Sequence, residues 1–130
     1  MHIYEQELTV TKDHLDRLHH VNNIEYVRWV QDIAEAHWNL KTSHDIRLNY
    51  YWLMVSHHIS YKGEAFLGDS ILLRTFILAS KAAKSTRTVE IYNKKTNKLL
   101  ATSETSWCFM SHESNRPTRI PAAIKDLFVK

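Results

Sequence analysis

The sequence predicts an α+β fold in which one curved antiparallel sheet of about five strands wraps around a single long helix. Three observations lead to this prediction. Residues 23–38 have helical periodicity and are apolar around most of the helix, strand-like sequence lies on both sides of them, and the chain has 130 residues, enough for one core. We therefore expect one domain over residues 1–130, with a second, short helix near the C-terminus.

The first elements are a strand and the long helix. Residues 2–11 mix apolar side chains with Thr and Glu, which suits a strand with one solvated face. Asn22, with Glu25 three residues later, resembles a capping box and predicts that the helix begins at Asn22 or Asn23. At about 100° per residue, the polar side chains of the helix form one stripe. That stripe consists of Glu25, Arg28, Asp32, Glu35 and Asn39.

Four more strands follow the helix. Residues 41–50 break the helical pattern and predict an irregular connection, whereas residues 62–69 contain both glycines and form the best turn signal. The strands are expected at residues 51–61, 70–79, 86–93 and 99–110, with a hairpin tip at 94–97. Residues 111–118 predict a polar loop, and Pro121 suits the first position of the short terminal helix.

Composition narrows the classes of function. The net charge is +3, from 17 basic and 14 acidic residues without a block of like charge, which argues against a nucleic-acid binder. The one cysteine, Cys108, excludes an internal disulfide, fits a reducing compartment and is expected to pack in a strand. Residues 1–7 lack the basic and apolar regions typical of a signal peptide, and no apolar run approaches about 18 residues, so we expect a soluble, cytoplasmic protein without membrane contact.

The expected sheet also predicts self-association. Its edge strands have unpaired backbone groups, and such edges promote pairing between chains. Apolar side chains such as Trp52 and Phe76 would be poorly covered in an isolated chain of this size. We therefore expect a homo-oligomer, either a homodimer or a homotetramer.

The loop before the long helix places reactive side chains at the helix N-terminus. The first backbone N–H groups of a helix have no acceptor within it and carry the positive end of its dipole, so they can stabilise a carbonyl oxygen that becomes negative. Asp16 and His20 lie just before these donors. Asn22 and Asn23 are interpreted first as caps, which also fix the position of the donor.

Residues 16–29, Asp-x-x-x-His-Val-Asn-Asn-x-x-Tyr-x-x-Trp, resemble the signature of the hotdog-fold thioesterases. The branch is the 4-hydroxybenzoyl-CoA thioesterase-like one, which includes acyl-acyl-carrier-protein (acyl-ACP) thioesterases. Weaker similarity comes from Tyr-x-x-Glu at 61–64, leading into Gly-Asp at 68–69, and from Arg-Pro-x-x-Ile-Pro at 116–121. The resemblance covers nearly the whole chain and implies a hotdog fold and thioester hydrolysis.

The resemblance also implies roles for single residues. By it, Asp16 matches the catalytic carboxylate of the family, His20 matches a histidine used by acyl-ACP thioesterases, and the amide of Asn23 matches the donor that polarises the thioester carbonyl. Glu64 matches a further acidic residue of those enzymes. Thioester hydrolysis by these groups needs no metal, and no cofactor is expected.

Two positions depart from the family pattern. Leu18 stands where plant-type enzymes have asparagine, which argues against transfer of an Asn/His mechanism, and His19 stands where bacterial relatives usually have glycine. The chemistry of the remaining residues agrees with the resemblance. One aspartate beside a helix N-terminus provides both a base or nucleophile and an oxyanion donor, and the sequence leaves open whether Asp16 is the base or the nucleophile.

Several residues have more than one interpretation. His20 either orients Asp16 or the substrate, or has a structural role alone. Tyr26 is expected in the core, where it could also line the acyl pocket. The pairs His19–His20 and His57–His58 lack metal-ligand spacing, because adjacent residues of a strand point to opposite faces.

Residues 81–87 form a small basic cluster between two expected strands. Such a cluster is usually a solvated hairpin. The alternative, implied by the resemblance, is that Lys84, Ser85 and Arg87 contact the phosphates of coenzyme A.

The leading hypothesis is an acyl-CoA or acyl-ACP thioesterase that releases a free acid and a thiol at a site formed between subunits. The alternative is a non-catalytic hotdog protein that binds acyl thioesters or another apolar ligand. A dehydratase or other lyase of the same fold is disfavoured, because the polar stripe of the helix lacks the required carboxylate and histidine arrangement. The sequence specifies neither the acyl chain nor the carrier.

Overall fold

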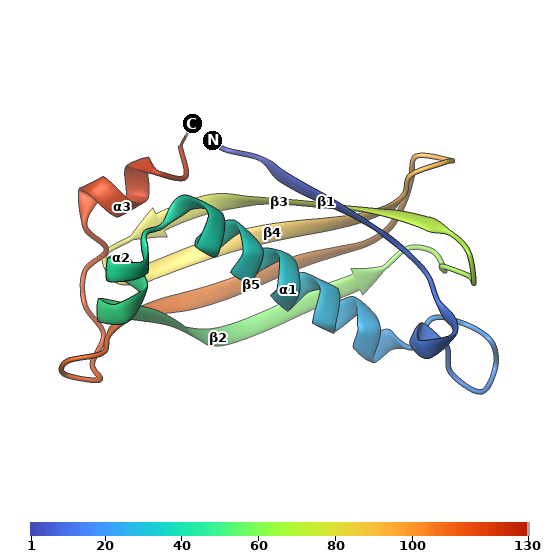
Figure 1. The fold of residues 1–130 in the computed structure, drawn as a ribbon, viewed down its shortest axis with the longest axis horizontal. Helices are drawn as coiled ribbons and strands as arrows, with labels where there is room; N and C mark the ends of the chain where they lie inside the picture. Colours follow the sequence, from blue (N-terminus) through green and yellow to red (C-terminus); the bar gives the residue numbers. More distant parts are fainter. Residues whose placement is uncertain (130) are drawn as a thin grey trace.

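The computed structural model describes residues 1–129 of the chain (Figure 1). Its elements, in chain order, are β1 (Tyr4–Thr9), the 3₁₀ turn η1 (Lys12–His14), α1 (Asn23–Lys41), α2 (His44–Asn49), β2 (Tyr50–Tyr61), β3 (Ser70–Lys81), β4 (Lys84–Asn93), β5 (Lys98–Ser111) and α3 (Ala122–Asp126). The two chain ends lie side by side, and the His2 N–H donates to the Phe128 carbonyl oxygen (2.9 Å). No helix in the described part of the chain is long and apolar enough to cross a membrane.

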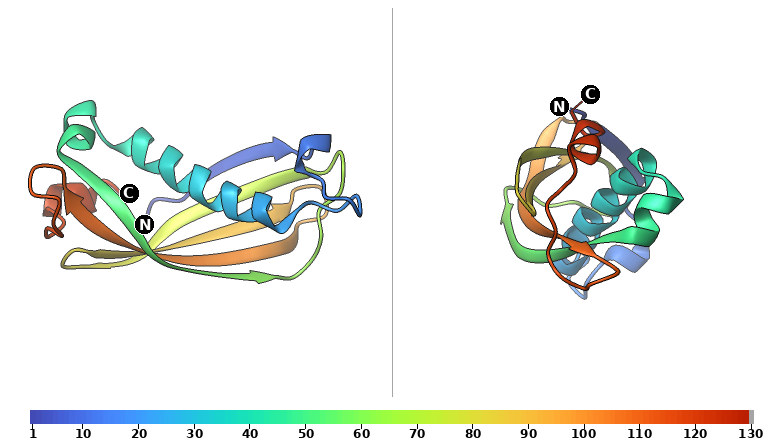
Figure 2. Two further views of the ribbon diagram at one scale, coloured as in Figure 1. Left: turned by 90° about the horizontal axis from the view of Figure 1, so that it is seen from below. Right: turned by 90° about the vertical axis from the view of Figure 1, so that its left-hand side faces the viewer.

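The sheet is antiparallel throughout and has the strand order β1-β3-β4-β5-β2. Figure 2 shows that the sheet bends around α1, which lies along its concave face. The pairing register shifts beside Met54, Ile77 and Ile91, and such irregularities increase the bend and twist of a strand. The predicted α+β architecture, a curved antiparallel sheet around one long helix, is confirmed, and the sheet has five strands.

Helix α1 is buried because its apolar positions recur every three or four residues and face the sheet. Its most deeply buried side chains are Tyr26, Trp29, Val30, Ile33 and His37. Alternate residues of the inner strands pack against this row, and the buried apolar ones include Ile71, Leu73, Val89 and Ile91. A second cluster, which Trp38 joins, covers the C-terminal end of α1 and consists of Phe109, Ile120, Ile124 and Phe128.

Three local predictions are wrong. Residues 41–50 contain α2, which begins after an N-cap, Ser43, whose hydroxyl accepts a backbone N–H of the first turn (3.2 Å). Pro121 is the N-cap of α3 and not its first residue. Glu25 is buried instead of lying on a solvated stripe, and its carboxylate accepts a hydrogen bond from Arg28 (3.3 Å) instead of completing a capping box.

The loop before α1 folds back on itself as a short antiparallel pair. Leu15 and Val21 form a β-bridge, and the Asp16 N–H donates to the His20 carbonyl oxygen (2.8 Å). Asn22 then caps α1 as predicted, because its side-chain oxygen accepts a backbone N–H of the first helical turn (3.1 Å). The pairing of Leu15 with Val21 and of Asp16 with His20 therefore fixes both ends of the turn at residues 17–19.

His19 lies in this turn with a φ of 62°. This left-handed conformation is strained for a residue with a Cβ and unstrained for glycine. The carboxylate of Asp16 supports the turn by accepting the N–H of Leu18 (2.8 Å) and of His20 (3.2 Å). The loop thus keeps the backbone shape that suits a glycine, although a histidine occupies the position.

A polar cluster is buried between α1 and the sheet. The Arg87 guanidinium donates through Nη1 to His37 Nδ1 (2.9 Å) and to Thr75 Oγ1 (3.0 Å), and His37 Nε2 lies 2.8 Å from His2 Nδ1. A guanidinium has only donors, so Nδ1 of His37 is the acceptor. In the neutral imidazole the proton then lies on Nε2, which donates to His2.

Burial, reinforced by the charge of Arg87, lowers the pKa of His37 to about 3. The His37 imidazole is therefore neutral at pH 7. Burial also lowers the pKa of Arg87 to about 10, which leaves the guanidinium charged at pH 7. The cluster consequently holds one positive charge and a histidine with a single defined tautomer.

The low pKa of His37 predicts a stability that decreases in acid. Between pH 6.5 and 3 the unfolded chain binds a proton at this residue and the folded chain does not, so the free energy of unfolding falls as the pH falls. One such proton contributes at most about 1.4 kcal/mol per pH unit. In His37→Gln, whose amide oxygen can still accept from Arg87, this contribution should be absent. Urea unfolding between pH 4 and 7 measures it, and parallel pH curves for wild type and variant would contradict the assignment.

The conformation of His19 predicts opposite responses to two substitutions. His19→Val should destabilise the protein by roughly 1–3 kcal/mol, because a β-branched residue is strongly disfavoured at positive φ, whereas His19→Gly should change stability by less than about 1 kcal/mol. Arg17→Val is the matched control, since Arg17 is exposed in the same turn and has no positive φ. Urea unfolding compares the three variants. Equal losses for valine at positions 17 and 19 would show that the conformation at His19 is unstrained.

Candidate active site

The candidate site lies at the N-terminal end of α1, where the loop of residues 15–22 meets the loop of residues 62–69 (Figure 1). The Val21 N–H donates to the Ala65 carbonyl oxygen (3.4 Å), and the Gly68 N–H donates to the Val10 carbonyl oxygen (3.0 Å). The first bond joins the two loops, which are far apart in sequence, and the second joins the later loop to the residue that follows β1. They bring together four of the predicted site residues, which are Asp16, His20, Asn23 and Glu64.

Tyr26 fastens the second loop to the helix. Its hydroxyl accepts the Ala65 N–H (3.0 Å), and its ring packs edge-on against Tyr61 and Trp29. Burial raises the pKa of the Tyr26 phenol, so it stays protonated. Tyr26 lies in the core as expected, and neither of the two pockets described in this chain is lined by it.

His20 and Glu64 form a pair across the two loops. His20 Nδ1 lies 2.9 Å from Glu64 Oε1, and the imidazole ring contacts Phe66 edge-on. Both side chains remain accessible to solvent, with 42% of His20 and 59% of Glu64 exposed. The pair therefore orients the imidazole at the surface of the site, where a ligand could reach it.

Asp16 is half-buried and is fixed through one of its two oxygens. Oδ1 accepts two backbone N–H groups of its own loop, while Oδ2 has no hydrogen-bond partner within residues 1–129. A carboxylate held in this way keeps one oxygen available to accept a proton or to attack an electrophile.

Asn23 is the first residue of α1 and follows the cap, Asn22. No acceptor for the Asn23 backbone N–H is found in the described part of the chain, as is usual for the first residue of a helix. The site thus combines an anchored carboxylate with an unpaired helix donor. Such a donor can stabilise an oxyanion.

The structure does not bring Lys84, Ser85 and Arg87 into one exposed cluster. Lys84 is exposed, but Ser85 (4% exposed) and Arg87 (6% exposed) are buried on the face of β4 that packs against α1. Side chains of a strand alternate between its faces, and both buried residues are in phase with the core residue Val89. The prediction of a shared phosphate-binding surface is therefore wrong for Ser85 and Arg87.

These residues are also distant from the candidate site along the sheet. In the β3–β4 pair, Lys84 faces Lys81 at one end, and Asn93 faces Ile71 at the other end, near the Asp16 loop. Ten residue steps along β3, roughly 33 Å of strand, separate the two ends. Within one chain, Lys84 therefore cannot contact a small ligand bound at Asp16.

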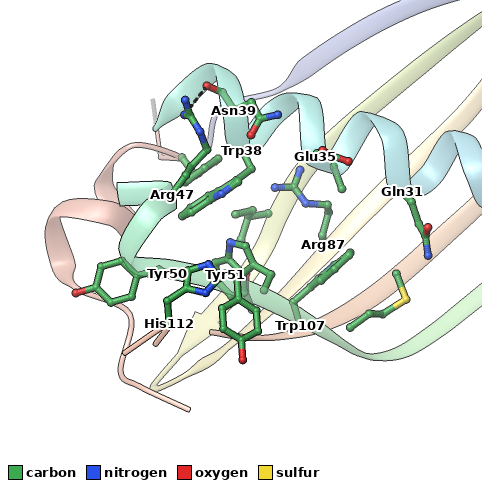
Figure 3. A pocket seen from close by; sticks show the side chains of 16 residues that line it. Gln31, Glu35, Trp38, Asn39, Arg47, Tyr50, Tyr51, Arg87, Trp107 and His112 are labelled. Atoms are coloured by element: carbon green, nitrogen blue, oxygen red, sulfur yellow. Dashed lines mark hydrogen bonds between the residues drawn. The ribbon is translucent and has the colours of Figure 1, made fainter. Parts of the chain in front are cut away.

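A pocket of about 480 Å³ lies at the C-terminal half of α1, away from Asp16 (Figure 3). It is bordered by α1, α2, β2 and β5, and its aromatic lining includes Trp38, Tyr51, Trp52 and Trp107. Arg87 reaches it from the sheet. Sequence reasoning missed this pocket, although the phase of Arg87 with the buried residues of β4 indicates an inward-facing cation.

Within residues 1–129, no three His, Cys, Asp or Glu side chains lie close enough together to bind a metal ion. His57 lies beside Ser103 instead, with Nε2 2.9 Å from Oγ, and Cys108 is a free, half-buried thiol in β5.

Residues 10–128 match the family model described as the thioesterase-like superfamily. Similar solved structures include a 1,4-dihydroxy-2-naphthoyl-CoA thioesterase from Synechocystis (TM-score 0.85, 16% identity, 98% of this chain and 96% of that chain covered). A Staphylococcus aureus protein in complex with CoA has a TM-score of 0.87 at 18% identity, with 97% of this chain and 81% of that chain covered. A probable thioesterase from Escherichia coli has a TM-score of 0.84 at 16% identity, with coverages of 97% and 98%.

A search of curated proteins finds no match. At identities of 16–18%, the solved structures establish that the fold is shared, and this fold is the hotdog fold that the motif implies. The family match spans all of the site loops and every strand after β1. The chain therefore belongs to the thioesterase-like superfamily.

Proposed function

We propose that the protein is a thioester hydrolase that converts an acyl-CoA or acyl-ACP to a free acid and a thiol. The observation that carries this proposal is the arrangement of Asp16, whose Oδ1 is anchored while Oδ2 is unpaired, one short loop before the unpaired N–H of Asn23. Hydrolysis of a thioester needs these two groups, a base or nucleophile and an oxyanion donor. Membership of the thioesterase-like superfamily supports the same activity.

In the proposed reaction, Asp16 accepts a proton from a water molecule as the water oxygen attacks the thioester carbonyl. The Asn23 N–H donates to the resulting oxyanion. The C–S bond then breaks, and the leaving thiolate takes the proton from Asp16, so that acid and thiol are released. In the alternative, the Asp16 carboxylate attacks the carbonyl itself, and the C–S bond breaks to give a mixed anhydride and the thiolate. Water then hydrolyses the anhydride, and the proton released in this step protonates the thiolate.

His20 and Glu64 are proposed to position the reacting groups. Glu64 engages Nδ1 of His20, which fixes the plane of the imidazole beside the loop that carries Asp16. Neither residue is needed to complete the proton balance of the reaction. Their loss should therefore affect turnover less than the loss of Asp16.

We also propose that a second copy of the chain completes the site, in a homodimer or a homotetramer. Strand β2 is at the edge of the sheet, and Leu53 and Val55 on it are more than half exposed. Further exposed apolar residues surround the candidate site, namely Leu18, Ile24, Tyr61, Phe66 and Leu67. The expectation that Trp52 and Phe76 are the poorly covered residues is wrong, because both are at least half-buried.

Acyl-CoA is the favoured carrier. Two of the similar structures are a CoA thioesterase and a protein in complex with CoA. The exposed Lys84 stays a candidate for a phosphate contact, and its distance from Asp16 within one chain means that it would act from the other copy.

Replacement of Asp16 tests the activity. Asp16→Asn keeps the shape of the side chain but removes its charge, so kcat should fall by roughly 10²–10⁴-fold with little change in KM. His20→Ala should reduce kcat less than Asp16→Asn does. Release of free thiol from acyl-CoAs of different chain lengths measures turnover, and Asp13→Asn, at an exposed position outside the site, is the matched control.

Two outcomes would contradict this mechanism. Wild-type turnover in a folded Asp16→Asn variant would remove Asp16 as the reacting group and would make Glu64 the next carboxylate to replace. Binding of acyl-CoA or acyl-ACP by the wild type without release of thiol would instead favour the non-catalytic alternative.

Self-association is tested separately. Light scattering at micromolar concentration should show at least a dimer, and Val55→Lys should shift the protein toward the monomer and lower its turnover, because a charge on the edge strand opposes pairing. Leu48→Lys is the matched control, since Leu48 is 60% exposed but lies on α2 and not on a strand edge. A wild-type monomer with full activity would show that the site needs no second copy.

A further inference from the structure

Arg87 places a buried positive charge beside the pocket at the C-terminal half of α1. Its side chain is buried, it lines the pocket, and its two hydrogen-bond partners, His37 and Thr75, are both uncharged at pH 7. No Asp or Glu forms an ion pair with it in residues 1–129. A buried charge without a counter-ion destabilises a fold unless other groups or a ligand compensate it.

Two donors of this guanidinium are free. Both bonds to the protein use Nη1, and no partner for Nε or Nη2 is found among the described residues. No side-chain nitrogen in this part of the chain is both sealed from solvent and unpaired, so Nε and Nη2 are accessible from the pocket. These two N–H groups point the same way and match the two oxygens of a carboxylate.

The rest of the lining fits a flat apolar body. Figure 3 shows Trp107 and Trp38 on either side of the space into which Arg87 projects, and Trp52 lines the same pocket. Aromatic walls with a few placed polar groups are typical of sites for small organic molecules, and the volume of about 480 Å³ is in the usual range.

The remaining charges argue for a single negative charge on the ligand. Arg47 also lines the pocket, and its Nη1 donates to the carbonyl oxygens of Thr42 and Asn39 at the end of α1. Glu35 lines the pocket too and is exposed. Two arginines and one glutamate give the lining a net charge of +1, which one carboxylate neutralises and a phosphate ester with two negative charges exceeds.

We propose that this pocket binds a small organic acid, whose carboxylate is held by Nε and Nη2 of Arg87 and whose flat apolar body packs among Trp38, Trp52 and Trp107. The site lies at the opposite end of α1 from Asp16 and does not depend on thioester hydrolysis. Its ligand class is distinct from that of a phosphate-bearing carrier.

The experiment uses the full chain and two ligands that differ only in charge. Calorimetric titration compares 4-phenylbutyrate with its neutral amide, 4-phenylbutanamide. The acid should bind at least about tenfold more tightly, because only the acid forms the bidentate pair with Arg87. Indole N–H signals in NMR spectra locate the binding, since Trp38, Trp52 and Trp107 line the pocket while the fourth tryptophan, Trp29, lies in the core outside it.

Variants test the role of the guanidinium. Arg87→Met should reduce the preference for the acid to nearly one, and Arg87→Lys should give an intermediate preference, because lysine keeps the charge but lacks the fork. Arg74→Met is the matched control, since it removes an arginine that pairs with Glu5 on the other side of the molecule from the pocket lining and should keep the wild-type preference.

Several results would overturn the proposal. They are equal affinity of acid and amide for the wild type, no binding of the acid at millimolar concentration, a shift of the Trp29 signal alone, or an unchanged preference in a folded Arg87→Met variant. The comparison of acid and amide uses the wild type only. It therefore remains decisive if Arg87→Met fails to fold.

Discussion

The structure depends on one constraint, the need to remove the apolar surface of α1 from water. Apolar side chains cover too much of this helix for a flat sheet to bury them, so the sheet curves, with register shifts beside Met54, Ile77 and Ile91. Curvature covers the middle of the helix and leaves its two ends accessible. The polar groups of the candidate site and of the aromatic pocket consequently lie toward the two ends of α1.

The two ends differ in electrostatics. At the N-terminus, the Asn23 N–H, which has no acceptor among the described residues, lies at the end of the helix where two loops carry the acidic side chains of Asp16 and Glu64. At the C-terminus, Arg47 donates to the carbonyl oxygens of Asn39 and Thr42, and the cation Arg87 projects from the sheet. The first arrangement suits a reaction in which negative charge develops on an oxygen, whereas the second suits a group that is already an anion.

Most of the fold can be predicted from the sequence, because periodicity reports burial directly. The strand at 86–93 and the start of α1 are examples, whereas α2 is too short for a periodic signal. In the site, the motif identifies Asp16 and His20, but the contact of His20 with Glu64 joins residues 44 apart and depends on tertiary structure. The prediction for Arg87 is wrong because the basic residues at 81–87 suggest an exposed turn. Arg87 is two residues from the buried Val89 on β4, so its side chain points to the same, inner face of the strand.

The single tautomer of His37 has a consequence for how this chain can diverge. With an arginine at position 87, position 37 must supply a hydrogen-bond acceptor, because a leucine there would leave a buried N–H unpaired. With an apolar residue at position 87, that requirement disappears, and the acceptor itself becomes the unpaired group. We therefore expect the two positions to change together among relatives, so that each single substitution passes through a less stable intermediate and the pair is inherited as a unit.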